Sequence, residues 1–139
     1  MDMGQIRDIM EKNIITIEKD QTMLQAAQLM KKNDISFIVI VENGNPIGVL
    51  SERDFVQKFC VDNKKPDEMK ITEIMSYKFR WVEPTTDIED AVQKMLNNNI
   101  RRLLVLDNKK LVGVITQTDL ASYLRDKLLV DETIKNIQK

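Results

Sequence analysis

The apolar residues of this chain follow a helical spacing in two places. Each stripe has the i, i+3, i+4, i+7 pattern that buries one face of a helix. Its members are Met23, Ala26, Ala27 and Met30 in the first stripe and Ile88, Ala91, Val92 and Met95 in the second. Thr22 and Asp87 precede the stripes and are suited to cap the helices. Two amphipathic helices are therefore predicted.

Strands are predicted on both sides of each helix. Residues 37–41 and 103–106 are continuously apolar, which is typical of strands covered on both faces. Shorter β-rich segments occupy residues 14–17, 46–50, 79–82 and 111–115. Glu-Asn-Gly-Asn-Pro at 42–46 is a turn by composition, and a further helix is expected to begin near Ser51 and near Thr116.

The chain repeats itself. Shifted by 65 residues, the segment 6–55 aligns with 71–120 without a gap, and the apolar positions match almost throughout. A fixed offset of this kind indicates a duplicated structural unit. The predicted fold class is therefore α+β, with a β-α-β-β-α unit that occurs twice.

The repeat sets the expected domain boundaries. Residues 1–62 are assigned to repeat 1 and residues 71–130 to repeat 2, each opening with a short helical lead-in. The polar, proline-containing stretch between them gives a linker at 63–70, and residues 131–139 are a tail or a helix extension.

Composition narrows the class of protein. Basic and acidic residues number 21 and 22, so nucleic-acid binding by phosphate neutralisation is not expected. The absence of histidine removes the commonest general base and metal ligand, and we expect neither an enzyme nor a metal site. The single cysteine, Cys60, and the lack of a long apolar run favour a cytoplasmic protein without a membrane segment.

One motif occurs in both repeats. Residues 48–54 read Gly-Val-Leu-Ser-Glu-Arg-Asp and residues 113–119 read Gly-Val-Ile-Thr-Gln-Thr-Asp. A hydroxyl residue followed three positions later by an acid can cap a helix. The same groups can instead hold a ligand, because a helix start attracts phosphate and a carboxylate can accept both hydroxyls of a ribose. The glycine would let a planar ring approach the backbone.

Here the sequence resembles pairs of CBS (cystathionine-β-synthase) domains, known as Bateman modules. The resemblance covers residues 6–120 and rests on the two motifs and on the Ile-Arg-Arg-Leu-Leu-Val-Leu-Asp run at 100–107. Leu104 replaces a proline that is frequent in the family, and Ser36-Phe37-Ile38-Val39 stands where basic residues and proline are common. The resemblance implies two pseudo-twofold-related repeats that pack through their sheets and leave two ligand clefts.

The resemblance also implies the residues of each cleft. In both clefts the aspartate would bind the ribose and the hydroxyl residue would bind ribose or phosphate. One cleft would contain Thr116 and Asp119, lined by Ile15, Ile35 and Ser36. The other would contain Ser51 and Asp54, opposite Arg80, Ile100 and Arg101.

An arginine distinguishes the two clefts. Arg102 stands where the family often places a phosphate-binding arginine, and the corresponding residue in repeat 1 is Phe37, which cannot bind an anion. We therefore expect tighter nucleotide binding at Thr116 and Asp119, although Arg53, Arg80 and Arg101 are candidates to serve the other cleft.

The resemblance finally implies a regulatory function. The expected ligand is AMP, ADP or ATP, with S-adenosylmethionine or NAD as alternatives, and no cofactor is required. We expect a homodimer that signals to a separate, unknown protein. The alternative is a dimeric scaffold whose clefts are vestigial.

Overall fold

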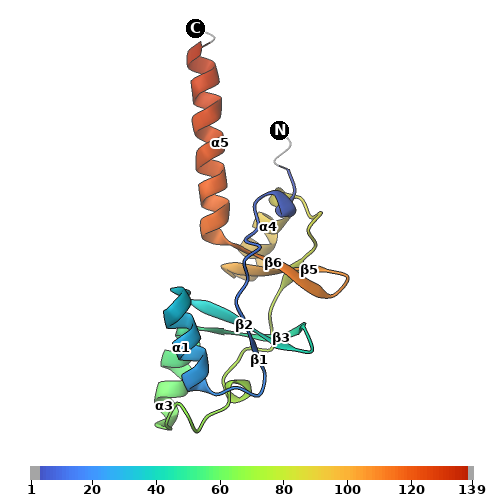
Figure 1. Ribbon diagram of the computed structural model, residues 1–139. Coiled ribbons are helices and arrows are strands. Elements are labelled where there is room, and N and C mark those ends of the chain that lie inside the picture. The colour runs from blue at the N-terminus through green and yellow to red at the C-terminus, as the bar shows by residue number, and fades with distance from the viewer. Residues whose placement is uncertain (1–3, 138–139) are drawn as a thin grey trace. The chain divides into compact units, whose positions relative to one another are not determined.

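The computed structural model describes residues 4–137 (Figure 1). It contains two compact units, and each unit combines segments that are far apart in the sequence. One unit consists of residues 14–79 with 109–111, and the other of residues up to 13, 80–108 and 112 onward. The predicted α+β class is confirmed, and each repeat has the order β-α-β-β-α.

The unit built mainly from repeat 1 contains a three-stranded sheet in the order β1-β2-β3. Its strands are β1 (Thr16–Glu18), β2 (Phe37–Glu42) and β3 (Asn45–Ser51). β1 pairs parallel with β2, and β2 pairs antiparallel with β3. The middle of β2 is buried, as its continuous apolar run predicts.

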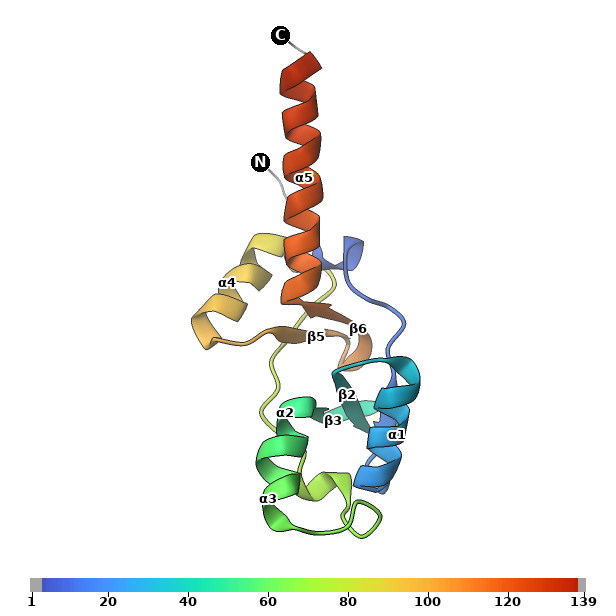
Figure 2. The same ribbon diagram turned by 90° about the vertical axis from the view of Figure 1, so that its left-hand side faces the viewer.

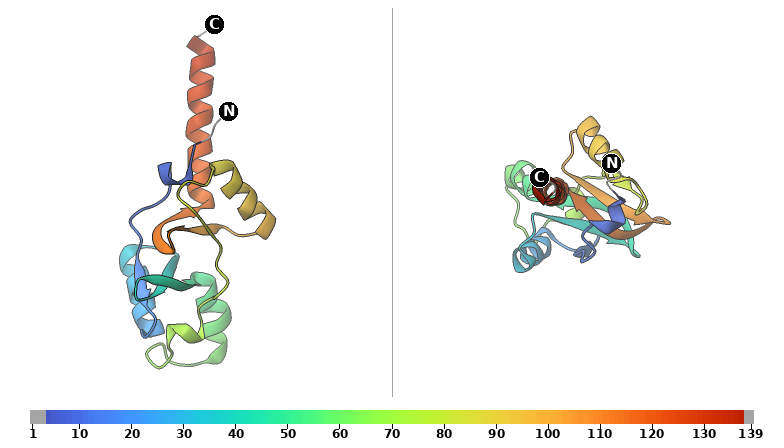
Figure 3. Two further views of the ribbon diagram at one scale, coloured as in Figure 1. Left: turned by 90° about the vertical axis from the view of Figure 1, so that its right-hand side faces the viewer. Right: turned by 90° about the horizontal axis from the view of Figure 1, so that it is seen from above.

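Helices cover this sheet. Helix α1 spans Met23–Asn33, and a second helical segment runs through α2 (Glu52–Asp54), the π-helical turn η2 (Phe55–Phe59) and α3 (Cys60–Asp62). Figure 3 shows both segments beside the sheet. The stripe of α1 packs into the core through Met23, Ala26 and Met30, which confirms the predicted helix face.

The unit built mainly from repeat 2 has an equivalent sheet in the order β4-β5-β6. Its strands are β4 (Trp81–Val82), β5 (Arg102–Asp107) and β6 (Lys110–Thr116). Helix α4 (Ile88–Asn98) lies beside β5, and helix α5 (Gln117–Ile137) continues from β6 (Figure 2). Of the tail or helix extension expected at 131–139, residues up to 137 are helical, and the last two lie outside the described residues.

The two lead-ins are exchanged between the repeats. Helix η1 (Ile6–Asp8) opens repeat 1, yet the side chain of Ile6 is fully buried in the core of the β4-β5-β6 unit. Helix η3 (Ile71–Glu73) opens repeat 2, yet Ile71, Ile74 and Met75 belong to the core of the β1-β2-β3 unit. The core beside each sheet is therefore completed by the lead-in of the other repeat.

The exchanged segments also cap the long helices. The Met23 N–H at the start of α1 donates to the Met69 carbonyl at 2.8 Å, and the Ile88 N–H at the start of α4 donates to the Gly4 carbonyl at 3.1 Å. Thr22 caps α1 as predicted, since its hydroxyl oxygen accepts from the Gln25 N–H at 3.3 Å. The predicted capping by the Asp87 side chain is wrong, because this side chain makes no capping hydrogen bond.

The predicted turn at 42–46 is confirmed and has a counterpart in repeat 2. Asn43 and Gly44 both have positive φ, at 51° and 81°, and Asn108 and Lys109 repeat this at 51° and 69°. Two consecutive residues of this kind between paired strands define a type I′ hairpin. Among the described residues, no helix is both long enough and apolar enough to cross a membrane.

Candidate functional site

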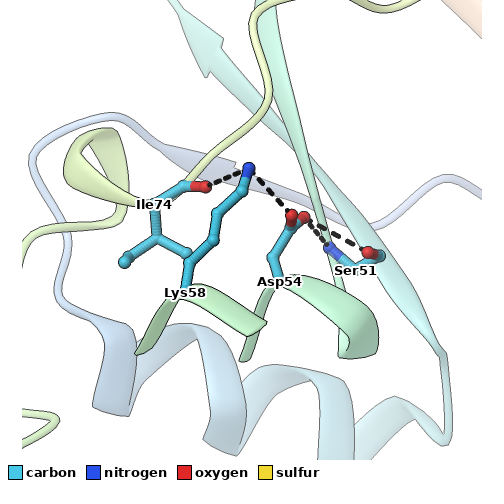
Figure 4. Close-up of polar contacts among 4 residues, drawn as sticks. All are labelled: Ser51, Asp54, Lys58 and Ile74. Atoms are coloured by element: carbon cyan, nitrogen blue, oxygen red, sulfur yellow. Dashed lines mark hydrogen bonds and ion pairs between the residues drawn. The ribbon is translucent and has the colours of Figure 1, made fainter. Parts of the chain in front are cut away.

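The first motif joins the end of β3 to the start of α2, and its carboxylate faces back onto the strand end. Asp54 Oδ2 accepts hydrogen bonds from the Ser51 N–H at 2.9 Å and from the Ser51 hydroxyl at 3.2 Å (Figure 4). The side chain of Asp54 is only 13% exposed. The carboxylate thus satisfies a backbone donor that the helix start leaves unpaired.

Lys58 neutralises this carboxylate. Its Nζ lies 3.0 Å from Asp54 Oδ1, four residues earlier on the same helical segment, and also donates to the Ile74 carbonyl at 3.2 Å (Figure 4). One ammonium group therefore links the motif to the lead-in that packs against this sheet. The spacing of four residues places the two side chains on one helix face.

The second motif has the same backbone geometry but a less occupied carboxylate. Asp119 Oδ2 accepts from the Thr116 N–H at 3.0 Å, and the Thr116 hydroxyl oxygen accepts from the Asp119 N–H at 3.2 Å. This is a reciprocal capping box. The residue 65 positions after Lys58 is Tyr123, which carries no positive charge.

The two carboxylates therefore differ in the acceptor positions that remain. An ionised carboxylate has about four lone-pair positions. Asp54 uses three of them, for the Ser51 N–H, the Ser51 hydroxyl and Lys58. Asp119 uses one, for the Thr116 N–H, among the contacts of the described residues. A ribose diol needs two, so only Asp119 can accept it without losing an existing contact.

The motif glycines make room for the lead-ins. A Cβ on Gly48 would lie 2.7 Å from Met75 Sδ, and a Cβ on Gly113 would lie 2.5 Å from Met10 Sδ. The strand backbone pairs with the lead-in at the same places, through isolated bridges between Val49 and Ser76 and between Glu11 and Val114. These contacts account for both glycines without a ligand ring.

Two of the remaining predicted residues lie beside the motif of their own repeat. The Ser36 carbonyl accepts from the Glu52 N–H at 3.0 Å, and the Arg101 carbonyl accepts from the Gln117 N–H at 2.9 Å. Both carbonyls thus hold the first N–H of the helix that follows the motif. Their expected assignment to the cleft of the opposite repeat stays a prediction.

The other predicted residues are spread over both units. Ile15 and Ile35 are partly buried and pack against the core of the β1-β2-β3 unit, whereas Ile100 packs against the core of the β4-β5-β6 unit. Arg80 is exposed, and its carbonyl accepts from the Leu104 N–H at 3.1 Å. Arg102 is partly buried at the first position of β5.

Arg102 and the second motif share one end of their sheet. β5 and β6 are neighbours and are joined by the two-residue turn at Asn108 and Lys109. The start of β5 and the end of β6 therefore lie at the same end of the hairpin, opposite the turn. Arg102 begins β5 and Thr116 ends β6. A guanidinium, a hydroxyl and a carboxylate therefore belong to one compact unit.

Sequence reasoning missed Lys58. The available signal was its position four residues after Asp54, which is the spacing of a helical ion pair. The contact with the Ile74 carbonyl could not be read in this way, because the two residues are 16 positions apart and meet only through tertiary packing.

Comparison with known proteins identifies the family. The CBS domain family matches residues 6–60 and 71–126. YhcV of Bacillus subtilis, a CBS domain-containing protein, is 33% identical over 119 residues, which cover 86% of this chain and 84% of the relative. An uncharacterized protein of Methanopyrus kandleri is 36% identical over 117 residues, and there the match covers 83% of this chain and 60% of the relative.

Solved structures agree with the sequence comparison. A conserved CBS domain protein from Thermoplasma acidophilum has a TM-score of 0.76 at 32% identity, covering 93% of this chain and 76% of that one. A CBS domain pair in complex with 5-methylthioadenosine and S-adenosyl-L-methionine shares the fold, with a TM-score of 0.79 at 24% identity, covering 88% and 97%. The chain therefore belongs to the CBS domain family and contains two CBS domains.

Proposed function

We propose that this protein is a regulatory module that binds an adenine nucleotide at the Thr116–Asp119 motif and signals its occupancy to a separate protein. The observation that carries the proposal is the state of the Asp119 carboxylate. It is fixed at the helix start by one backbone N–H, and no other residue among those described donates to its remaining acceptor positions. A ribose diol can donate two hydrogen bonds to a carboxylate in this state.

The surroundings of Asp119 favour a phosphate on the same ligand. Helix α5 is 21 residues long and begins next to Thr116, so its dipole favours an anion at this end. The Gln117 and Asp119 N–H groups already have acceptors within the protein, so the dipole and not these donors is the attraction. Arg102 belongs to the same end of the hairpin and supplies a guanidinium that can form charge-assisted hydrogen bonds with phosphate oxygens. Ribose-binding and phosphate-binding groups thus occur together, which is the combination a nucleotide needs.

The family supports the choice of an adenine compound. The two ligands of the related CBS domain pair, 5-methylthioadenosine and S-adenosyl-L-methionine, both contain adenosine. AMP, ADP and ATP add phosphates, for which Arg102 is suited, and are therefore proposed ahead of S-adenosylmethionine and NAD. Ile15, Ile35 and Ser36 are proposed to contact the base, and no residue is assigned a catalytic role.

The proposal is tested by titrating AMP, ADP, ATP, S-adenosylmethionine and NAD into the protein by calorimetry and by thermal shift. A ligand that binds the native state raises the melting temperature, by an amount corresponding to about 2.7 kcal/mol at a hundredfold excess over Kd. Asp119→Asn keeps an acceptor for helix capping but removes the charge, and should abolish the shift. If none of the five compounds changes the melting temperature, the sensor proposal is wrong.

A second candidate function is a dimeric scaffold with vestigial clefts. The observation in its favour is the first motif, where Lys58 and Ser51 already occupy most of the Asp54 carboxylate. Exposed apolar residues fit either function, since Val56 and Leu124 offer surface for a homodimer. Light scattering with and without nucleotide separates the candidates: a scaffold forms the same dimer in both cases and shows no thermal shift.

A further inference from the structure

We propose that Lys58 is a specificity-determining residue that makes the two CBS domains unequal, so that each chain binds one nucleotide, at Asp119, and the Asp54 motif is closed to a ribose diol. This inference rests on the proposed function and adds the number of sites, their order and the residue that sets both.

The two carboxylates differ in the number of acceptor positions left for a ligand. With Ser51 and Lys58 bound, Asp54 has about one acceptor position left, whereas a ribose diol requires two. Asp119 has enough positions for both hydroxyls. The backbone capping contact is common to the two motifs, so the Ser51 hydroxyl and the Lys58 ammonium account for the difference.

Lys58 is anchored by two acceptors. Its ammonium is held by the Asp54 carboxylate at 3.0 Å and by the Ile74 carbonyl at 3.2 Å. These two acceptors come from a helix and from the exchanged lead-in, so the lysine is fixed from two directions, as Figure 4 shows. A diol that displaced it would have to break a charge-assisted contact with a carboxylate that is only 13% exposed.

Repeat 2 has no counterpart of Lys58. Position 123 is a tyrosine, which packs against the core of the β4-β5-β6 unit and has no ammonium to pair with Asp119. The helix there is a regular α-helix, while Lys58 lies in the π-helical turn Phe55–Phe59. The lysine and the altered helix thus occur together in repeat 1.

The test compares Lys58→Met with the wild-type protein by calorimetric titration of AMP. Methionine keeps the length of the side chain but removes its charge, and because the Lys58 side chain is 46% exposed the substitution should leave the fold intact. Wild type should bind one AMP per chain and Lys58→Met two. The affinity of the second site should rise about 10- to 100-fold. Lys64→Met is the matched control and should behave as wild type.

Two further measurements link the result to the diol and to Asp54. The second site of Lys58→Met should be lost in the double variant with Asp54→Asn, and it should not form with 2′-deoxy-AMP, which lacks the diol. With Lys58 present, Asp119→Asn alone should remove AMP binding and Asp54→Asn alone should leave it unchanged. These two single variants test the inference even without the lysine variant.

The outcomes separate this inference from the proposed function. Two sites of similar affinity in wild type, or an unchanged second site in Lys58→Met, overturn the role of Lys58 and leave nucleotide binding standing. A second site that accepts 2′-deoxy-AMP equally well overturns the diol-based reason. If AMP binds no variant, the same titrations are made with whichever of ADP, ATP, S-adenosylmethionine and NAD shifts the wild type. The absence of binding by all five compounds overturns the proposed function together with the inference.

Discussion

Met75 packs directly over Gly48, so that a Cβ at position 48 would lie 2.7 Å from the Met75 sulfur and 3.0 Å from the Ser76 carbonyl oxygen. Gly48→Ala should therefore destabilise the protein by about 1–3 kcal/mol through overpacking, measured by urea unfolding. In a Met75→Ala background Gly48→Ala should cost less than in the wild type, but it should still cost something because the carbonyl contact remains. A Gly48→Ala protein as stable as wild type would contradict the close packing.

The exchanged lead-in predicts where a core substitution acts. Ile6 is fully buried in the β4-β5-β6 unit, which also contains Trp81, the only tryptophan of the chain. Ile6→Ala should lower the free energy of unfolding by about 2–5 kcal/mol, and Trp81 fluorescence should report the earlier transition.

The exposed Ile137 provides the control for this experiment. Ile137→Ala should change the free energy of unfolding by no more than about 0.5 kcal/mol. Equal effects of the two substitutions would mean that the lead-in does not belong to this core.

The two type I′ turns differ at one position, where repeat 1 has Gly44 and repeat 2 has Lys109 at a φ of 69°. A left-handed conformation costs a non-glycine residue roughly 1–2 kcal/mol. Replacing that residue by glycine removes this cost, but part of the gain is lost because glycine makes the unfolded chain more flexible. Lys109→Gly should raise the free energy of unfolding by about 0.5–1 kcal/mol. The reverse change, Gly44→Lys, should lower it, and opposite signs from the matched pair are the expected result in thermal denaturation.

Asp119 has two separable roles, helix capping and ligand binding. Asp119→Ala should weaken AMP binding by roughly 30- to 1000-fold, or about 2–4 kcal/mol, and should also cost about 1 kcal/mol of stability through the lost cap. Asp119→Asn should lose the affinity but keep most of the stability, since asparagine also caps well. Calorimetric affinities equal to wild type in both variants would exclude Asp119 from the site.

Arg102 is expected to bind the phosphate of the ligand and not its nucleoside part. Arg102→Met should weaken AMP binding by about 10- to 100-fold, because a charge-assisted hydrogen bond contributes about 1.5–3 kcal/mol. Adenosine, which has no phosphate, should bind the variant and the wild type alike. A similar loss for both compounds would indicate that the arginine supports the fold of β5 and does not contact the ligand.

Local signals in the sequence were sufficient for most of the fold. Apolar periodicity identified the helices and the buried strands, and the 65-residue offset identified the duplication. Periodicity says which face of a helix is buried but not which sheet covers it, so the exchange of the lead-ins was not predicted. The Gly4 carbonyl, which accepts from the Ile88 N–H at the start of α4, was not predicted for the same reason, because it is distant in the sequence.

The candidate site was predictable as a motif but not as a pair of unequal carboxylates. The hydroxyl-to-acid spacing is local, and the structure confirms that both aspartates contact the N–H of their own motif. The state of Asp54 depends in addition on Lys58 and, through it, on Ile74. The contact among Asp54, Lys58 and Ile74 depends on tertiary packing, which local sequence patterns do not predict.

The exchange of lead-ins also determines how the gene could be divided. A chain cut between residues 62 and 69 would leave the N-terminal fragment without Met69, Ile71 and Met75, and the C-terminal fragment without Ile6 and Met10. Each fragment would expose a hydrophobic gap that only the other fragment fills. The two halves should therefore be unstable when expressed singly and complement each other when produced together, as the pieces of a split protein do.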